Sequence, residues 1–168
     1  MIRLVLFLLL TTTCLGQELL LLGNSQLAAD TFIGLDGYDY TYSITDNIIS
    51  KSGVKGTFQF SDIQLGDVTT VDIINPLKVV AFYNAFNTVV FLDNRLNEIK
   101  RINFNDLPNF LNAGAARNAG NNRLWLLNTD TQQIELYNYG TQQRIEISQP
   151  ITAEIKELAS NFNYCFVL

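Results

Sequence analysis

Short segments rich in β-branched and aromatic residues recur along the chain, and clusters of Asn, Asp and Gly separate them. Such segments are typical of β-strands, and the clusters are typical of hairpin turns, because Asn, Asp and Gly tolerate positive φ angles. Four clusters are similar: Asp36–Asp39 (DGYD), Asn84–Asn87 (NAFN), Asn118–Asn121 (NAGN) and Ser160–Asn163 (SNFN). A strand-like segment follows each one. We therefore interpret each cluster as the turn between the first two strands of a repeated unit.

The spacing of the clusters indicates the architecture. They begin at residues 36, 84, 118 and 160, so successive units are 48, 34 and 42 residues apart. Units of roughly 35 to 50 residues with several strands are typical of β-propeller blades. The repetition also continues past the turn, because Val89–Phe104 aligns with Leu124–Tyr139 at a shift of 35 residues. The sequence predicts an all-β fold of repeated four-stranded antiparallel meanders, forming a partial, open propeller of about three to four blades.

The same alignment bears on whether the clusters could be catalytic. Asp36 aligns with Asn84, Asp39 with Asn87, and the later Asp93 with Asn128. An Asn cannot replace a catalytic carboxylate. The alignment therefore favours structural turns over an acid/base pair.

Several further segments complete the predicted units. A lone strand is expected at Gln17–Leu22, before the first unit, and two extra strands are expected at 56–65 and 67–74. The segment 112–117 is rich in small residues, which leaves its element open. Residues 152–160 fit either a short helix or a strand, and alignment with residues 77–83 favours the strand.

The first sixteen residues are typical of a secretory signal peptide. Arg3 is followed by the apolar run Leu4–Leu10, which is too short for a membrane span of roughly 20 residues. Gly16 and Cys14 suit the −1 and −3 positions of a cleavage site. Gln17 is then the expected N-terminus of the mature protein.

Two alternatives to this leader remain open. One is lipidation at Cys14, although the three threonines before it make a poor lipobox; the other is a buried N-terminal strand. With the leader assigned to residues 1–16, residues 17–168 form one propeller-like repeat domain. The expected location is extracytoplasmic, meaning the periplasm, the outer-membrane surface or the medium. No transmembrane span is expected after cleavage.

Charge and cysteine content narrow the function classes. The chain has a formal net charge of −5, which becomes −6 once Arg3 is removed with the leader. This balance argues against nucleic acid and anionic membranes as partners. Without Cys14, Cys165 has no partner for an intrachain disulfide. No Asn-x-Ser/Thr sequon occurs, so the pattern favours a bacterial envelope over a eukaryotic secretory route.

Few residue types needed for catalysis are present. The chain contains no His, which excludes Ser-His-Asp and Cys-His catalysis and most zinc sites. Cys165 lies in an apolar run without a basic neighbour and fits a structural thiol. The acids of Asp36–Asp46 lack the order of a calcium loop, and no phosphate-binding loop occurs. We therefore assign no catalytic residue, no metal site and no cofactor.

A glycosidase-type acid pair is the remaining route to catalysis. The candidate carboxyl groups are Asp62, Asp67, Asp72, Asp106 and Glu154. Nothing in the sequence determines which of them approach each other.

Aromatic residues cluster around the predicted hairpins: Tyr38, Tyr40, Tyr42, Phe82, Tyr83, Phe86, Trp125, Tyr137 and Tyr139. Because alternate strand residues face opposite sides, some of these rings could be exposed and bind sugar or peptide. Packing between adjacent blades is the favoured alternative. Trp125, which has leucine on both sides, is expected in the core.

Two segments carry a family resemblance. Residues 121–139 (NNRLWLLNTDTQQIELYNY) resemble blades of bacterial sensor-type and quinoprotein-like β-propellers, through Leu124–Leu126 and Leu136–Asn138. Residues 71–99 resemble blades of secreted propeller-like proteins of the Gram-negative envelope. The resemblance implies a propeller architecture and an envelope location. The motifs of WD40 repeats, Asp-boxes and quinone-binding tryptophan repeats are absent from the sequence.

These observations predict a non-catalytic binding or scaffolding propeller that contacts a protein or glycan of the cell envelope through loops at one end. The alternative is a propeller-based carbohydrate-active enzyme with acids from different blades. Two exposed carboxylates about 5 to 10 Å apart would favour the enzyme.

The C-terminal segment is expected to end inside a unit. Tyr164, Phe166 and Leu168 should share one face of a strand, with Cys165 and Val167 on the other. This pattern predicts the N-terminal part of a longer propeller, whose isolated form associates through its open edge.

Overall fold

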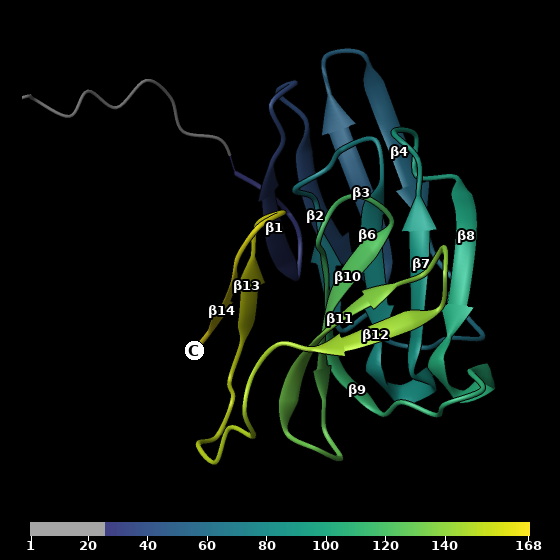
Figure 1. Ribbon diagram of the computed structural model, residues 1–168. Coiled ribbons are helices and arrows are strands. Elements are labelled where there is room, and N and C mark those ends of the chain that lie inside the picture. Colours follow the sequence, from purple (N-terminus) through teal and green to yellow (C-terminus); the bar gives the residue numbers. More distant parts are fainter. Residues whose placement is uncertain (1–25) are drawn as a thin grey trace, which may run out of the picture.

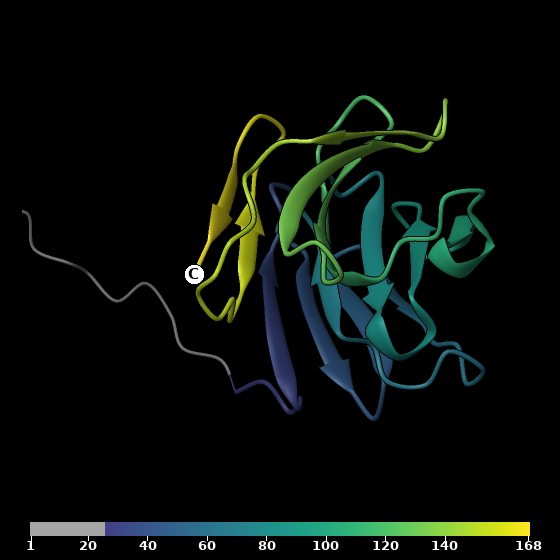
Figure 2. The same cartoon turned by 60° about the horizontal axis from the view of Figure 1, so that its bottom comes forward.

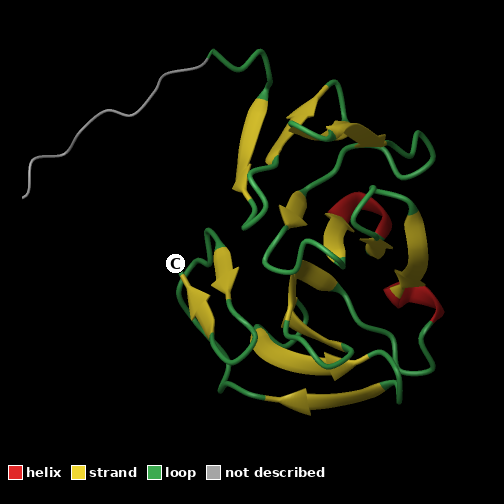
Figure 3. Ribbon diagram, turned by 90° about the horizontal axis from the view of Figure 1, so that it is seen from above, coloured by secondary structure: helices red, strands yellow, loops and turns green. Residues whose placement is uncertain are grey.

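The computed structural model describes residues 26–168 and shows an all-β arrangement (Figure 1). Three four-stranded antiparallel sheets follow one another, each with its strands in chain order, and a two-stranded hairpin follows the third sheet. These units lie in chain order around an arc (Figures 2 and 3). Among the described strands, β14 pairs with β13 and not with β1, so the arc is unclosed. The prediction of repeated four-stranded antiparallel meanders in an open, propeller-type arrangement is confirmed.

The first sheet contains β1 (Thr31–Leu35), β2 (Thr41–Thr45), β3 (Ile48–Gly53) and β4 (Gly56–Phe60). The second contains β5 (Thr70–Asp72), β6 (Val79–Tyr83), β7 (Thr88–Leu92) and β8 (Glu98–Asn103). The third contains β9 (Ala113–Asn118), β10 (Arg123–Asn128), β11 (Gln133–Asn138) and β12 (Gln143–Glu146). The hairpin is β13 (Leu158–Ser160) with β14 (Cys165–Val167), and two 3-10 turns are η1 (Asn84–Phe86) and η2 (Phe104–Asp106).

The structure assigns a secondary-structure element to both segments that the sequence left undecided. The small-residue segment forms most of β9, and the segment 152–160 ends in strand β13 without a helix. The predicted signal peptide and the strand expected at Gln17–Leu22 lie outside the described residues. Within residues 26–168, no helix combines the length and apolarity needed to cross a membrane.

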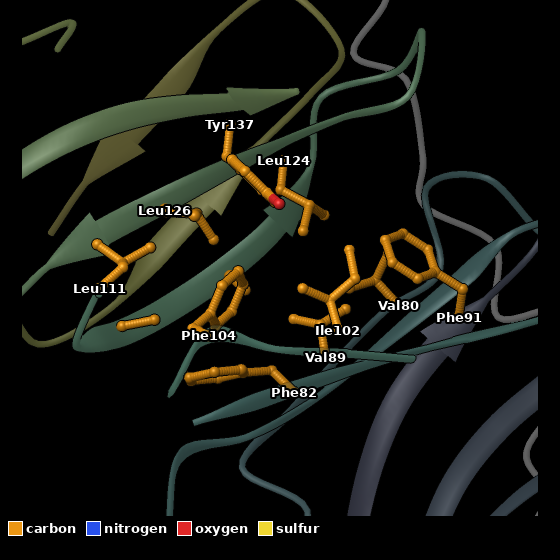
Figure 4. Packing of buried hydrophobic residues seen from close by; sticks show 12 residues of the cluster. Val80, Phe82, Val89, Phe91, Ile102, Phe104, Leu111, Leu124, Leu126 and Tyr137 are labelled. Carbon is orange, nitrogen blue, oxygen red and sulfur yellow. The ribbon is translucent and has the colours of Figure 1, made fainter. Parts of the chain in front are cut away.

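The second sheet is central because both of its faces are covered. All five residues of β6 and all five of β7 are buried. Successive side chains of a strand point to opposite faces. Val80 and Phe82 therefore pack with the third sheet (Figure 4), whereas Val79 and Tyr83 pack with the first. A separate apolar cluster around Trp125 joins the third sheet to the final hairpin.

Many of the turns use one device, in which an Asn or Asp side-chain oxygen accepts a hydrogen bond from the backbone N–H two residues further on. The described residues that do this are Asp36, Asp62, Asp72, Asn75, Asp93, Asn103, Asn118, Asn128, Asn138 and Asn161. This local bond stabilises a turn in place of strand pairing. The interpretation of Asn and Asp as turn residues is consistent with these contacts.

The expected equivalence of the four clusters is wrong for one of them. Asn84–Asn87 lies between β6 and β7, the second and third strands of its sheet, whereas the other three clusters lie between the first two strands of their units. The 35-residue alignment likewise places β7 and β8 over β10 and β11. The physical reason is that Asn and Asp form the turns of successive hairpins alike. The sequence therefore repeats at the level of the hairpin and does not distinguish one hairpin of a sheet from the next.

The final hairpin follows the predicted alternation. Tyr164, Phe166 and Leu168 are 65%, 55% and 67% exposed, whereas Cys165 packs against the cluster around Trp125. Val167, expected on the same face as Cys165, departs from the alternation because it is 38% exposed. Burial raises the pKa of the half-buried Cys165 thiol to about 11. The thiol is therefore protonated at neutral pH, which fits a structural role and not a nucleophile.

Candidate binding groove

Turns from the first two sheets meet at one end of the molecule and surround a groove of about 440 Å³. The β1–β2 and β3–β4 turns contribute from the first sheet, and the β5–β6 and β7–β8 turns contribute from the second. The residues that line it are Tyr38, Tyr40, Lys51, Lys55, Phe58, Pro76, Leu77, Asn94 and Arg95. The groove therefore combines three cationic side chains with three aromatic rings, and no acidic residue lines it.

Lys51 is held in place by a buried carboxylate. Its Nζ lies 3.2 Å from Oδ2 of Asp36, and both side chains are almost completely buried. The register of β2 with β3 places Lys51 opposite Tyr42, whose hydroxyl donates to the same Asp36 at 3.1 Å. The ammonium group also lies 4.5 Å from the ring centre of Tyr40 and 5.0 Å from that of Tyr42. Cation–π contacts of this kind add to the ion pair.

Asp36 is stabilised in its ionised form. Burial acts to raise its pKa, but hydrogen bonds from the N–H groups of Tyr40 and Tyr38 and the charge of Lys51 outweigh burial and lower the pKa. Burial and the charge of Asp36 together raise the pKa of Tyr42 well above its usual range. The carboxylate is therefore charged and the phenol neutral at neutral pH. This arrangement keeps Lys51 rigid at the groove.

The other two cations are available to a ligand. Lys55 and Arg95 are exposed on the β3–β4 and β7–β8 turns. Neither forms an ion pair with another residue of the range 26–168. The groove therefore combines one rigid ammonium group with two mobile cationic side chains. Sequence reasoning had named Tyr38 and Tyr40 but none of the three cations.

The structure divides the aromatic candidates into two groups. Tyr42, Phe82, Tyr83, Trp125 and Tyr137 are buried between the units. Tyr38 and Phe86 are 65% and 48% exposed, and Tyr40 and Tyr139 are half-buried beside grooves. The expected core position of Trp125 is confirmed.

The acidic candidates have structural partners of their own. Asp62 pairs with Arg101, and Asp67 accepts a hydrogen bond from Asn47. Burial acts to raise the pKa of Asp62, but the hydrogen bond and charge of Arg101, together with hydrogen bonds from the N–H groups of Gln64 and Leu65, lower it. Asp72 accepts from the backbone N–H of Asn118, which joins the second and third sheets. Asp106 and Glu154 are exposed on separate segments, in η2 and in the loop before β13. Within residues 26–168, no group of three or more His, Cys, Asp or Glu side chains is arranged to hold a metal.

The acid pair that the structure does bring together is a different one. Glu135 and Glu146 are directly opposite in the β11–β12 hairpin, beside a larger polar cavity of about 710 Å³. Glu135 is buried; its Oε1 accepts from Asn128 at 2.6 Å, and its Oε2 lies 3.5 Å from Nε of Arg144. The sequence holds a signal for this pairing, because Glu135 and Glu146 are equally far from a turn centred on Gly140 and Thr141. Because Glu135 is already paired, the groove with free cations is the stronger candidate despite its smaller volume.

Asp39 tests whether the first turn is structural. We expect Asp39→Asn to change the free energy of unfolding by less than about 0.5 kcal/mol, as for surface positions without special contacts. The residue is exposed and has a φ of 61°, which Asn adopts readily. Urea unfolding followed by circular dichroism measures the change. A larger loss of stability, or loss of a function at unchanged stability, would refute the structural interpretation of this turn.

Three unclosed four-stranded antiparallel sheets in chain order, with a further hairpin, define a propeller-type protein. No family model matches the sequence, and no curated protein matches it. Among solved structures, the chain is similar to a catalytically inactive virginiamycin B lyase from Staphylococcus aureus with quinupristin, with a TM-score of 0.50 and 10% identity. The similarity covers 71% of this chain and 41% of that chain.

A second structure, the selenomethionine-substituted virginiamycin B lyase from Staphylococcus aureus, has a TM-score of 0.48 and 10% identity over the same shares of the two chains. The chain therefore spans about two fifths of the length of the lyase it matches. At this identity the similarity shows a propeller-type fold alone. The predicted secretion and envelope location stay predictions.

Proposed function

We propose that this protein is a non-catalytic binding module that acts outside the cytoplasm and binds a glycan carrying carboxylate groups. The observation that supports the proposal most strongly is the lining of the groove between the first two sheets, where three cations lie beside three aromatic rings. The envelope location rests on the leader-like pattern of residues 1–16. The expected partner is therefore an acidic glycan of the cell envelope.

The chemistry of the groove fits such a ligand. Guanidinium and ammonium groups bind carboxylates through charge-assisted hydrogen bonds, and Arg95 can do so with two parallel bonds. The apolar faces of Tyr38 and Tyr40 can pack against the C–H face of a sugar ring. Lys55 and Arg95 supply the attraction to a carboxylate, because the charge of Lys51 is already balanced by Asp36.

The proposal can be tested with a matched pair of ligands. Calorimetric titration of the purified protein with a galacturonic acid trimer should show binding, and the neutral methyl ester of the trimer should bind at least about tenfold more weakly. A hydrogen bond to a charged group contributes about 1.5 to 3 kcal/mol, and about 1.4 kcal/mol corresponds to a factor of ten. Equal affinity for the acid and the ester would contradict a role for the cations.

Variants locate the site. Lys55→Gln with Arg95→Gln removes two exposed charges without disturbing the buried pair, and we expect it to weaken acid binding at least about tenfold. Lys156→Gln removes an exposed cation outside the groove and should leave the affinity unchanged. If both variants bind the acid as the parent protein does, the ligand does not use this groove.

A second candidate function is a carbohydrate-active enzyme, favoured by the Glu135–Glu146 pair. Directly opposite residues in an antiparallel pair have Cβ atoms about 4.5 to 5.5 Å apart, which suits the carboxylate separations of glycosidases. Both acids come from one sheet and not from different blades. Release of new reducing ends from the trimer, abolished by Glu135→Gln, would establish this function in place of the non-catalytic one.

A further inference from the structure

A second groove lies between the second and third sheets, one junction along from the first. It has a volume of about 300 Å³ and is lined by Lys78, Phe91, Ile99, Lys100, Asn122, Tyr139 and Gly140. Like the first groove, it contains cations and aromatic rings and no acidic residue. Its lining comes from the β5–β6, β9–β10 and β11–β12 turns and from strands β7 and β8, so it lies one sheet further along the arc than the first groove.

Both ammonium groups of this second groove lie close to the ring of Tyr139. The Nζ atoms of Lys78 and Lys100 are 5.7 and 4.9 Å from the centre of its ring. Lys78 donates to Oδ1 of Asn122 at 3.3 Å and to the hydroxyl of Tyr139 at 3.2 Å, and Lys100 donates to the carbonyl of Tyr139 at 3.2 Å. These partners are neutral, and neither lysine forms an ion pair within residues 26–168. The two positive charges are therefore held in place but not neutralised.

The two grooves are adjacent and open at the same end of the sheets. The β5–β6 turn separates them, with Leu77 lining the first groove and its chain neighbour Lys78 lining the second. The β7–β8 hairpin is also shared, with Arg95 in the first groove and Lys100 in the second. Because Leu77 and Lys78 are consecutive residues, whose Cα atoms are about 3.8 Å apart, the two grooves meet on either side of this turn.

Positive charge is concentrated at the end of the molecule where the two grooves open. Five of the eleven Lys and Arg residues of this acidic chain line the two grooves. The opposite end, where the β2–β3, β4–β5 and β10–β11 connections lie, carries exposed Asp46, Asp67 and Asp130, whereas the groove end has exposed Asp39 beside its five cations. A polyanion would be repelled from that end and attracted to the grooves.

We propose that the two grooves act together and that the ligand is a polyanionic glycan, with carboxylates on successive sugars, that bridges both. This inference rests on the proposed function and extends it from one acidic sugar segment to a chain. Two linked contacts convert the second binding event into an intramolecular one, so affinity should rise steeply once a ligand is long enough to reach both grooves.

Ligand length tests the inference on the same purified protein. We expect a galacturonic acid octamer to bind at least about 100-fold more tightly than the trimer. Lys78→Gln with Lys100→Gln keeps hydrogen-bond donors at both positions and removes both charges. In this variant the octamer advantage should fall below about tenfold, the remainder reflecting the several registers in which a long chain can occupy one groove. Trimer binding in the first groove should not change.

The outcomes separate the inference from the function on which it rests. Suppose that trimer binding depends on Lys55 and Arg95, but the octamer binds less than about tenfold more tightly than the trimer. This result would retain the proposed function and overturn the bridging inference. An unchanged octamer advantage in the Lys78 and Lys100 variant would also overturn it, provided that circular dichroism shows a folded protein. Failure of both ligands to bind would refute the two proposals together. Lys156→Gln, which removes one exposed cation outside both grooves, serves again as the control.

Discussion

Replacing Asp36 with Asn is expected to lower the free energy of unfolding by about 3 to 5 kcal/mol, the usual cost of breaking a buried ion pair by removing one partner. The Asn oxygen can still accept the two backbone hydrogen bonds of the turn, so the change removes the charge opposite Lys51 and the acceptor of the Tyr42 hydroxyl but keeps the turn. Asp39→Asn, the same substitution three residues later on an exposed side chain, is the matched control. If the two variants have equal stability in urea unfolding, the buried pair contributes nothing.

The same contacts predict how acid affects the two proteins. The pKa of Asp36 is lowered in the folded state, so this group stabilises the fold above the unfolded-state value of about 4 and loses that contribution as the pH falls through its folded-state pKa. The parent protein should therefore lose more stability than Asp36→Asn when the pH is lowered from 5 towards 2. If the free energy of unfolding falls equally with pH in the two proteins, Asp36 does not stabilise the fold through its charge.

A double variant separates charge from packing. Adding Lys51→Met to Asp36→Asn removes the ammonium group that Asp36→Asn leaves buried without a partner, and an uncompensated buried charge is the main cost of breaking such a pair. We expect most of the lost stability to return. The same variant also removes one of the three cations of the first groove.

The strands and turns of this fold could be predicted from the sequence because they depend on neighbouring residues. Apolar runs such as Val79–Tyr83 indicated strands, and Asn and Asp indicated the turns between them. The assignment of Asn84–Asn87 to a first hairpin was wrong for a related reason. Asp72 ends β5 with the same side-chain bond that Asp93 makes two strands later, so local turn chemistry does not tell one hairpin from another.

The candidate groove could be predicted only in part, because it forms between sheets. Tyr38 and Tyr40 were recognisable as aromatic residues near a turn. Lys51, in the segment Ile48–Gly53, looks like an ordinary solvent-facing strand residue, and its burial depends on Asp36 fifteen positions earlier. Arg95 reaches the groove from the next sheet. Such contacts depend on how the sheets pack against each other. The alternation of residues along one strand carries no information about that packing.

The other large effect expected is at the junction of the third sheet with the final hairpin. Trp125 on β10 is 7% exposed and packs with Ile134 and Leu158. Its indole N–H donates to the carbonyl of Asn161 at 3.0 Å, and Arg117 donates to the carbonyl of Leu158 at 2.7 Å. Trp125 therefore contributes both apolar contact and one of the polar links that hold the hairpin.

Trp125→Ala is expected to lower the free energy of unfolding by about 3 to 5 kcal/mol, as for other buried aromatic residues. This is a large share of the 5 to 15 kcal/mol typical of a native protein. Trp125→Phe keeps a ring but loses the hydrogen bond to Asn161. Its free energy of unfolding should therefore fall by about 1 kcal/mol more than the smaller buried area accounts for. Hydrogen exchange of β13 and β14 amides should be faster in Trp125→Ala, because their packing surface is gone. If urea unfolding shows a loss below about 1 kcal/mol and hairpin exchange is unchanged, Trp125 does not secure this junction.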